Sequence, residues 1–292
     1  MKPMNRHRTG NRRRRTPERM RRKSERKLPP LHLNKILLSN LSFFVAALRF
    51  LTIIPLPGRF GSGSEELARS VPFFPLIGLL LGCIVVPAAW ALHLLAPPPV
   101  TAVFLTFLLL SFSGGLHLDG LADTADGFFS ARPRERMLEI MRDSATGAMG
   151  VIALVLLLAL KITCLASMGD KLIFAVFLMP FAGRTAILLL MAMLPYIRPE
   201  GGLGSLFAVS FNNHHARTVS LAALLVFSGI AWAASGSQGV LVAFAVLLLT
   251  TLFAVFCRQK IGGVTGDTLG AVCELAEAVV ALVFALKVGG AV

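Results

Sequence analysis

The chain has 292 residues, of which 55% are hydrophobic and 15% charged, and its formal net charge at pH 7 is +14. Together with a mean hydropathy of +0.73, this composition is typical of a membrane protein and excludes an ordinary soluble domain. The four cysteines are scattered, mostly within apolar segments, so they indicate neither a metal-binding motif nor a disulfide framework.

The basic charge is concentrated at the N-terminus. Residues 1–28 contain thirteen Lys or Arg and two Glu, which accounts for +11 of the total of +14. This segment is too polar to form a core, so we predict a disordered cytoplasmic tail over residues 1–34 and a membrane-embedded domain over residues 35–292. Because the tail has no aromatic residues between its charges, we expect it to contact anionic lipid and not nucleic acid.

Apolar segments, several of them near the length of about 20 residues that crosses a bilayer, fill the rest of the chain. Long polar loops alternate with very short turns between them. The long loops contain ten Lys or Arg and the short turns only Lys171, so the positive-inside rule places the long loops in the cytoplasm. The apolar segments are 36–56, 71–96, 100–118, 148–168, 172–194, 218–235, 239–257 and 270–288, and the long loops are 57–70, 119–147, 195–217 and 258–269.

The first apolar segment, 36–56, is unlike the others. It carries Arg49 and ends in Pro55-Leu-Pro57, and an arginine inside a span costs about 2.5–3.5 kcal/mol. If this segment crossed the membrane, the basic tail would also lie outside the cell. We therefore predict a re-entrant or interfacial helix here and about seven spanning helices after it. The fold class is then an all-α, polytopic membrane bundle with its C-terminus on the far side.

The segment from Gly115 to Gly127 carries three aspartates, Asp119, Asp123 and Asp126, at i, i+4 and i+7. On an α-helix they share one face, within about 60° of arc. Three carboxylates on one stripe repel one another unless a cation lies between them, and a hard divalent ion such as Mg²⁺ fits that demand. A carboxylate-bound metal that is open on one side serves phosphate transfer. We therefore predict these aspartates as metal ligands.

Two further motifs carry charge near or inside apolar segments. In Met141–Gly150 we assign Arg142 to phosphate contact and Asp143 to a fourth metal ligand. The alternative is a charge pair at the membrane edge, with Gly147 and Gly150 packing helices. Arg184 lies in the middle of an apolar segment, where arginines are functional or ion-paired.

Polar loops supply the remaining candidates. After the fifth apolar run, Arg198 and Glu200 have the character to bind a phosphate or ribose, with an ordinary polar turn as the alternative. The glycine-rich segment Lys260–Gly270 opens a helix, a geometry that presents backbone N–H groups to phosphate. Asp267 and Glu274 lie on one face of that helix, and we expect Glu274 to face Arg184, Lys260 or the aspartates. Glu277 is rotated about 80° from the Asp267 face, so we expect it to matter less.

Five of these segments together resemble the cobalamin synthase family, the adenosylcobinamide-GDP ribazoletransferases. They are Leu48–Pro57, Phe73–Gly78, Gly115–Gly127, Met141–Gly150 and Gly262–Leu275, and the resemblance covers about residues 40–288. The basic tail is longer than the family needs, and Asn212–His215 matches no motif of it.

The resemblance implies an inner-membrane, Mg²⁺-dependent enzyme with its active site facing the cytoplasm. Its substrates would be adenosylcobinamide-GDP and α-ribazole or its 5′-phosphate, and its products adenosylcobalamin or the 5′-phosphate, and GMP. A homo-oligomer and contact with other enzymes of nucleotide-loop assembly are possible partners. The residues assigned to catalysis are Asp126, Asp143, Arg142 and Arg184; those assigned to the substrate are His117, Arg198, Glu200, Lys260, Gly263, Thr265, Asp267 and Glu274; those assigned to Mg²⁺ are Asp119, Asp123, Asp126 and Asp143.

Two other classes share some of these features. A CDP-alcohol-type membrane phosphotransferase also carries spaced aspartates, but its pattern adds Gly-x-x-x-Asp-x-x-x-Asp a few residues after the first Asp-Gly, with Ala-Arg between, and this chain has neither at that place. An ion-coupled transporter would place its acids near the bilayer midplane and show an internal repeat. Here the acids cluster at the predicted cytoplasmic edge, and no clear repeat is visible.

Overall fold

The computed structural model describes residues 32–198, 207 and 213–286, and the regular secondary structure in these ranges is entirely helical, as predicted. The chain divides into two compact units, Met1–Leu38 and Ser39–Val292. The predicted basic tail lies almost wholly outside the described residues, so its disorder stays a prediction. The helices are α1 (His32–Leu51), α2 (Ser64–Ala68), α3 (Phe74–Leu95), α4 (Pro98–Ser113), α5 (Leu116–Phe128), α6 (Arg134–Ile140), α7 (Ala148–Ser167), α8 (Leu172–Met193), α10 (Asn213–Ser235), α11 (Ser237–Ile261) and α12 (Gly266–Ala285), with 3-10 turns η2 (Val71–Phe73) and η3 (Gly169–Lys171).

Six helices of the described chain are long and apolar enough to cross a membrane: α3, α7, α8, α10, α11 and α12. Helices α4 and α5 pass the same test only as a pair, and they are bent by 91° with respect to each other. The prediction of about seven spans is therefore confirmed if α4 and α5 count as one broken span. Helix α5 alone, with 13 residues, is too short to cross.

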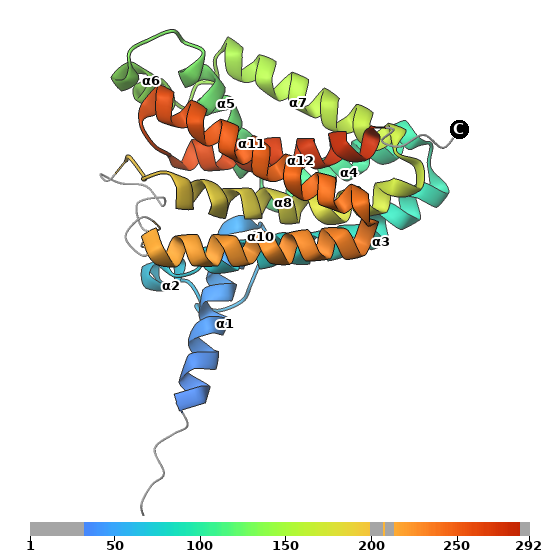
Figure 1. Ribbon diagram of the computed structural model, residues 1–292, viewed down its shortest axis with the longest axis horizontal. Coiled ribbons are helices and arrows are strands. Elements are labelled where there is room, and N and C mark those ends of the chain that lie inside the picture. The colour runs from blue at the N-terminus through green and yellow to red at the C-terminus, as the bar shows by residue number, and fades with distance from the viewer. Residues whose placement is uncertain (1–31, 199–206, 208–212, 287–292) are drawn as a thin grey trace, which may run out of the picture. The chain divides into compact units, whose positions relative to one another are not determined.

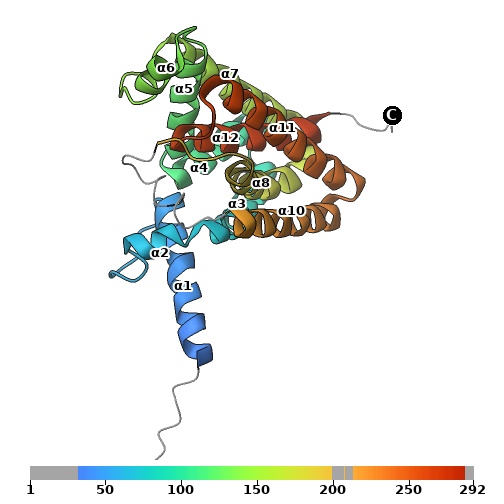
Figure 2. The same ribbon diagram turned by 60° about the vertical axis from the view of Figure 1, so that its left-hand side comes forward.

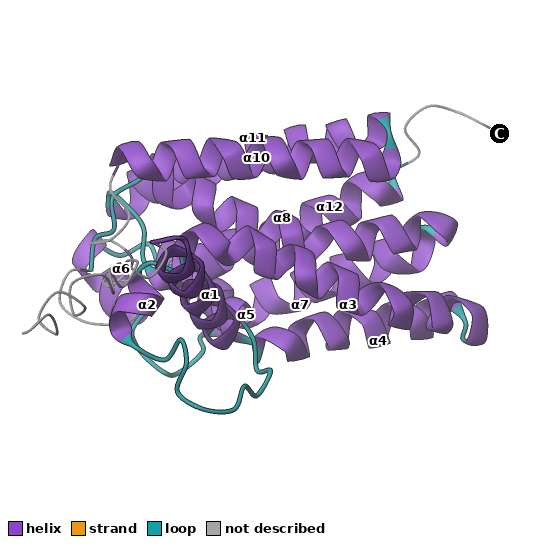
Figure 3. Ribbon diagram, turned by 90° about the horizontal axis from the view of Figure 1, so that it is seen from below, coloured by secondary structure: helices purple, strands orange, loops and turns teal. Residues whose placement is uncertain are grey.

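The spanning helices run between two unlike ends of the second unit (Figures 1 and 3). At one end lie tight connections, such as the single residue Gly236 between α10 and α11 and the η3 turn between α7 and α8. At the other end lie the longer loops, the short helices α2 and α6, and the first turn of α12 (Figure 1). This separation is the one expected from the alternation of long and short polar segments.

The helix α1 ends at Leu51, so Arg49 does not lie in the middle of a span. Its guanidinium donates to the carbonyl oxygens of Leu56 at 2.9 Å and Gly58 at 2.8 Å, and so orders the loop that follows. The apolar part of the helix, Leu37–Leu51, is shorter than a span. The prediction that this segment does not cross the membrane agrees with that length.

Helix α8 is the centre of the unit, packed by α3, α10 and α12 (Figure 2). In its most apolar window 83% of the residues are buried, against 17% for α10, so α10 presents most of its apolar surface outward, as a lipid-facing helix does. Small residues allow the close packing at the centre, because lipid supplies no hydrophobic drive between helices. At Gly78 of α3, an added Cβ would lie 2.3 Å from the carbonyl oxygen of Pro180 in α8.

Candidate active site

Two consecutive glycines determine the direction of helix α5. Gly114 and Gly115 have φ of 60° and 78°, in the left-handed region that favours glycine, and the chain bends there by 91°. Further along α5, Gly120 lies against the backbone of Asp267, where an added Cβ would come within 2.7 Å of the carbonyl oxygen. The corner and this close approach hold α5 across the first turn of α12.

The three aspartates of α5 lie in different surroundings, although they share one helix as predicted. Asp119 is exposed, Asp123 is half-buried and Asp126 is buried. Burial, together with the neighbouring carboxylates of Asp119, Asp267 and Asp126, raises the pKa of Asp123 to about 7. An aspartate of α12, Asp267, therefore belongs to this group of negative charges, and a cation beside Asp123 would be favoured.

Asp126 caps a neighbouring helix. Its carboxylate accepts hydrogen bonds from the backbone N–H groups of Gly147 at 2.7 Å and Gly150 at 2.8 Å. These groups belong to the first turn of α7, where a negative charge is favoured. An added Cβ at Gly147 or Gly150 would lie 2.5 or 2.4 Å from a carboxylate oxygen, so both glycines make room for Asp126. The structure gives Asp126 a capping role that uses both of its oxygens, and its catalytic and metal-binding role stays a prediction.

Arg142 and Asp143 are neighbours in sequence that point to different surroundings. Arg142 lines a cavity at this end of the bundle, as a phosphate contact should. Asp143 is exposed, and its Oδ1 accepts a hydrogen bond from the N–H of Ala145 at 3.1 Å. It does not line the cavity, so the structure lends no support to Asp143 as a catalytic residue or a fourth metal ligand.

Helix α12 begins with a capping box. Thr265 accepts a hydrogen bond from the Thr268 N–H, and the Thr268 hydroxyl accepts one from the Thr265 N–H. Thr265 is fully buried, and Gly263 packs so closely on Pro195 that an added Cβ would lie 2.4 Å from its carbonyl oxygen. These two residues were predicted to bind phosphate. In the structure Thr265 caps the N-terminus of α12, and Gly263 allows the preceding loop to pack on Pro195. The first turn itself, at Gly266, lines the cavity in the way that suits an anion.

Arg198 is held against α12 by the pairing of two loops. Tyr196 and Val264 form an isolated parallel bridge, with backbone hydrogen bonds of 2.9 and 3.0 Å at Val264. The Nη1 of Arg198 then lies 2.8 Å from Oδ2 of Asp267, and both residues line the cavity. Burial raises the pKa of Tyr196, so its hydroxyl stays protonated at neutral pH.

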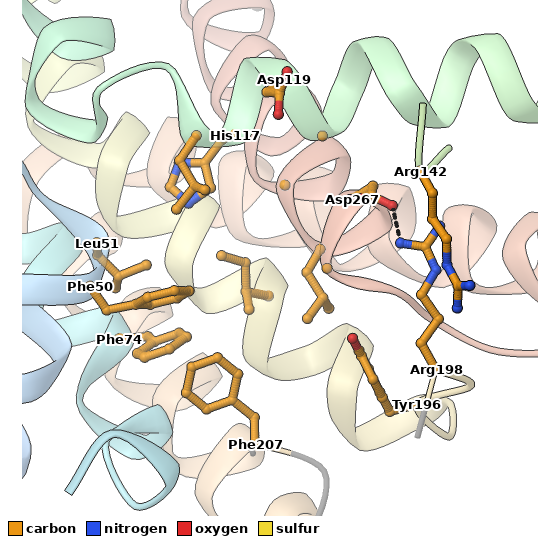
Figure 4. Close-up of a pocket in the computed structure, with 16 residues that line it drawn as sticks. Phe50, Leu51, Phe74, His117, Asp119, Arg142, Tyr196, Arg198, Phe207 and Asp267 are labelled. Atoms are coloured by element: carbon orange, nitrogen blue, oxygen red, sulfur yellow. Dashed lines mark hydrogen bonds and ion pairs between the residues drawn. The ribbon is translucent and has the colours of Figure 1, made fainter. Parts of the chain in front are cut away.

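The cavity has a volume of about 710 Å³ and two chemically different ends. Figure 4 shows Asp119, Asp267, Arg142 and Arg198 at one side and a group of aromatic rings at the other. In the aromatic group, Phe50 stacks on Phe74 with centroids 5.9 Å apart, and Phe207 meets both rings edge-on. The sequence analysis did not identify this apolar end, because single phenylalanines in apolar segments give no signal of their own.

A second cavity, of about 650 Å³, lies beside the first. It is lined mainly by uncharged groups, among them Thr52, Ser113 and Thr146, and it shares Asp119 with the first cavity. Asp119 thus lies between two spaces, which suits a reaction that joins two molecules.

A buried cluster of charges lies deeper in the bundle than the cavity. Lys161 of α7 contacts Glu274 at 2.6 Å and Glu277 at 2.8 Å, and Arg184 of α8 contacts Glu277 at 2.6 Å. All four side chains are at most 5% exposed. The Nη2 of Arg184 also lies 3.4 Å from Nδ1 of His117, which lines the cavity as its predicted substrate contact requires.

This cluster corrects two predicted roles. Arg184 was assigned to catalysis and Glu274 to the substrate, but both lie in the buried cluster and neither lines the first cavity. Glu274 does face inward as expected, although its partner is Lys161. Glu277, expected to matter less, is the residue that pairs with both cations. Lys161 was missed, but a lysine inside an apolar segment was a signal that could have identified it.

Lys260 also lies away from the cavity. Its Nζ donates to the carbonyl oxygen of Phe128 at 2.7 Å and lies 5.5 Å from the centroid of the Phe256 ring. A cation there stabilises the C-terminal end of α5, so the structure does not support the predicted phosphate contact. Glu200 falls outside the described residues, so its role stays a prediction.

Within the described ranges, no three His, Cys, Asp or Glu side chains converge into a ready metal-binding cluster. The acidic group nevertheless consists of carboxylates only: Asp119 and Asp267 line the cavity, and Asp123 lies close enough to both for their charges to raise its pKa. That donor chemistry fits a hard cation such as Mg²⁺ and does not fit zinc.

The chain is similar to proteins of one kind over most of its length. A family model described as cobalamin-5-phosphate synthase matches residues 43–285. A curated relative from Roseiflexus sp. (strain RS-1), named adenosylcobinamide-GDP ribazoletransferase, is 41% identical over 80% of this chain and 85% of its own length. Relatives of the same name from Desulforamulus reducens and Escherichia coli (strain K12 / DH10B) are 40% and 37% identical, over 79% and 81% of this chain and 91% and 96% of their own lengths. No solved structure gives a significant match.

Proposed function

The chain belongs to the cobalamin-5-phosphate synthase family, and we propose that it is an adenosylcobinamide-GDP ribazoletransferase. It would join α-ribazole, or its 5′-phosphate, to adenosylcobinamide-GDP and release GMP. The products would be adenosylcobalamin, or its 5′-phosphate, and GMP. The observation that carries this proposal is the cavity in which Arg142, Arg198 and the first turn of α12 lie beside Asp119 of α5 and Asp267 of α12.

The residues at the charged end suit a diphosphate. Arg142 and Arg198 offer guanidinium donors, which bind phosphate oxygens in two-pronged fashion. The first turn of α12 adds backbone N–H groups and the positive end of the helix dipole. Because Asp267 already neutralises part of the Arg198 charge, the substrate phosphate competes with that carboxylate for the arginine.

The reaction transfers a phosphorus atom between two oxygens. A ribose hydroxyl oxygen of α-ribazole other than the 5′ oxygen, which carries the phosphate in α-ribazole 5′-phosphate, attacks the phosphorus attached to cobinamide, the bond from that phosphorus to the GMP oxygen breaks, and GMP leaves with the electron pair. The hydroxyl proton passes to a carboxylate of the α5 group. Asp119 is well placed to lie near both reactants, since it lines both cavities.

We further propose that Asp119, Asp123 and Asp267 hold Mg²⁺. A bound Mg²⁺ would supply charge stabilisation to the departing phosphate. The support is the donor set and the raised pKa of Asp123, which is caused first by burial and then by the neighbouring carboxylates of Asp119, Asp267 and Asp126. Arg198 would keep Asp267 oriented toward this group.

The proposed location is the inner membrane, with the cavity facing the cytoplasm. The support is the distribution of Lys and Arg, which favours the end with the long loops. Assembly into a homo-oligomer and contact with other enzymes of nucleotide-loop assembly stay predictions.

The test is GMP release by the purified protein from adenosylcobinamide-GDP, with and without α-ribazole and Mg²⁺. We expect release only when both are present. Release of CMP from a CDP-activated lipid precursor would favour the CDP-alcohol-type phosphotransferase instead. If neither nucleotide is released, but an ion gradient drives solute uptake into vesicles that contain the protein, the result would favour the transporter alternative.

A further inference from the structure

The buried cluster of Lys161, Arg184, Glu274 and Glu277 ends at a residue of the cavity wall. It contains two cations and two anions, so its formal charge is balanced if all four are ionised. Its contacts join α7, α8 and α12, and the Arg184 guanidinium then reaches His117 on α5. Such a cluster costs desolvation, and ion pairing inside the bundle does not by itself require a fifth residue at the cavity.

The contact between Arg184 and His117 specifies a tautomer. Arginine carries only hydrogen-bond donors and does not lose its proton in proteins. Nδ1 of His117, 3.4 Å from Nη2 of Arg184, must therefore be the acceptor, which leaves the proton of the neutral ring on Nε2.

The other edge of the ring carries Nε2, in a side chain that is 3% exposed and lines the first cavity. Among the described residues, no hydrogen-bond partner of His117 Nε2 is found within the chain. Nε2 is also not one of the fully buried side-chain atoms that lack a hydrogen bond. His117 lines the first cavity, while Arg184 does not. In Figure 4 the ring lies between the aromatic group and Asp119. The Nε2–H group is thus a donor accessible from the cavity.

We propose that His117 is an Nε2–H hydrogen-bond donor to a phosphate oxygen of the substrate, and that Arg184 is its positioning residue. This inference rests on the proposed function for the identity of the substrate. Glu277 fixes Arg184, and Lys161 fixes Glu277, so the buried cluster sets the direction of one donor at the cavity. A donor of this kind stabilises negative charge without taking up a proton itself.

Replacement of His117 by two amides separates this role from packing. His117→Gln retains an N–H close to the position of Nε2, whereas His117→Asn offers its amide near Nδ1 and leaves the cavity without a donor. We expect His117→Asn to lower kcat by about 100-fold, the effect of losing one transition-state donor. We expect His117→Gln to stay within about 10-fold of the parent chain. His93→Gln, at the end with the tight turns, is the matched control and should have the parent activity.

A spectroscopic measurement tests the tautomer without using activity. In protein labelled with ¹⁵N-histidine, the His117 signals, identified by their loss in His117→Gln, should show a protonated Nε2 and a bare Nδ1. Arg184→Lys should shift these signals toward a mixture of tautomers and lower kcat more than it raises KM.

Two results would overturn the proposal: a protonated Nδ1 in the parent chain, or equal activity losses in the Gln and Asn variants. Failure of the parent chain to release GMP would instead count against the proposed function, since the tautomer is read in the absence of substrate.

Discussion

Two groups of acids lie about two helical turns apart along α12, from Asp267 to Glu274, and they are balanced in opposite ways. Glu274 and Glu277 are buried, and each contacts a cation at 2.6 Å. Among the described residues, Asp119 and Asp123 have no ion pair, and Asp267 pairs with Arg198 alone. The first group carries its counter-ions in the chain, whereas the second has an excess of negative charge at a cavity. The contrast shows that intramembrane acids can serve the fold, while the acids at the cavity suit a ligand.

The largest effect should come from breaking the balance of the buried group. Lys161→Met leaves Glu274 buried without a cation, and loss of one partner of a buried pair costs about 3–5 kcal/mol. We expect a large drop in the thermal unfolding midpoint of the protein in detergent. The double variant Lys161→Met, Glu274→Gln should recover much of it, because Glu277 keeps Arg184. A single variant as stable as the parent chain would show that the cluster is not needed for folding.

The second prediction addresses the unbalanced group. Asp123→Asn should abolish GMP release and leave the unfolding midpoint unchanged or slightly higher, because it removes one of several like charges. Asp170→Asn, at the exposed end with the tight turns, is the matched control. Near-normal turnover of Asp123→Asn at saturating Mg²⁺ would remove the metal proposal.

A third comparison separates two cations that were both predicted to bind phosphate. Arg198→Gln should raise KM for adenosylcobinamide-GDP by about tenfold or more, in line with the 1.5–3 kcal/mol of a charged hydrogen bond. Lys260→Gln should change KM little, since Lys260 binds the end of α5, and should lower stability by about 0.3–1 kcal/mol. Steady-state kinetics and thermal melting of both variants decide between these roles. The assignment fails if Lys260→Gln raises KM as much as Arg198→Gln does.

The smallest effect concerns Asp126, which belongs to the aspartate stripe by sequence and to the fold by contact. Asp126→Asn keeps one acceptor for the first turn of α7 and should cost about 1 kcal/mol. We expect its activity to fall far less than that of Asp123→Asn at a temperature where both are folded. Equal loss of activity would return Asp126 to the catalytic group.

The sequence was sufficient to predict the features that depend on local pattern. Hydropathy located the spanning helices, and the spacing of Asp119, Asp123 and Asp126 predicted one helix correctly. It could not show which of these carboxylates would be free, because that depends on α7, whose first turn lies 21 residues or more along the chain from Asp126. Arg184 and Glu274 were assigned to the site because the sequence did not show that their partners, Glu277 and Lys161, lie on other helices. An isolated charge in an apolar segment indicates that a partner exists, but not which of several it is.

Family resemblance supplied the reaction, and the structure adds an arrangement that no single motif contains. The aromatic side of the cavity combines Phe50, Phe74 and Phe207 from three separated segments. Gly263 and Thr265 illustrate the opposite case, since they belong to a glycine-rich motif and yet serve packing and capping. A motif marks the neighbourhood of a site, and only the fold distinguishes the residues that face it.

The bridge between Tyr196 and Val264 has a consequence for how the protein tolerates changes in length. Because backbone hydrogen bonds join the two loops, an inserted residue between Leu194 and Arg198 would shift the arginine out of register with α12. An insertion in this loop is therefore expected to keep the Arg198 guanidinium beside Asp267 only if it follows Arg198. Chimeras between relatives should therefore be joined after Arg198, so that the spacing from Leu194 to Arg198 is kept as it is in one parent.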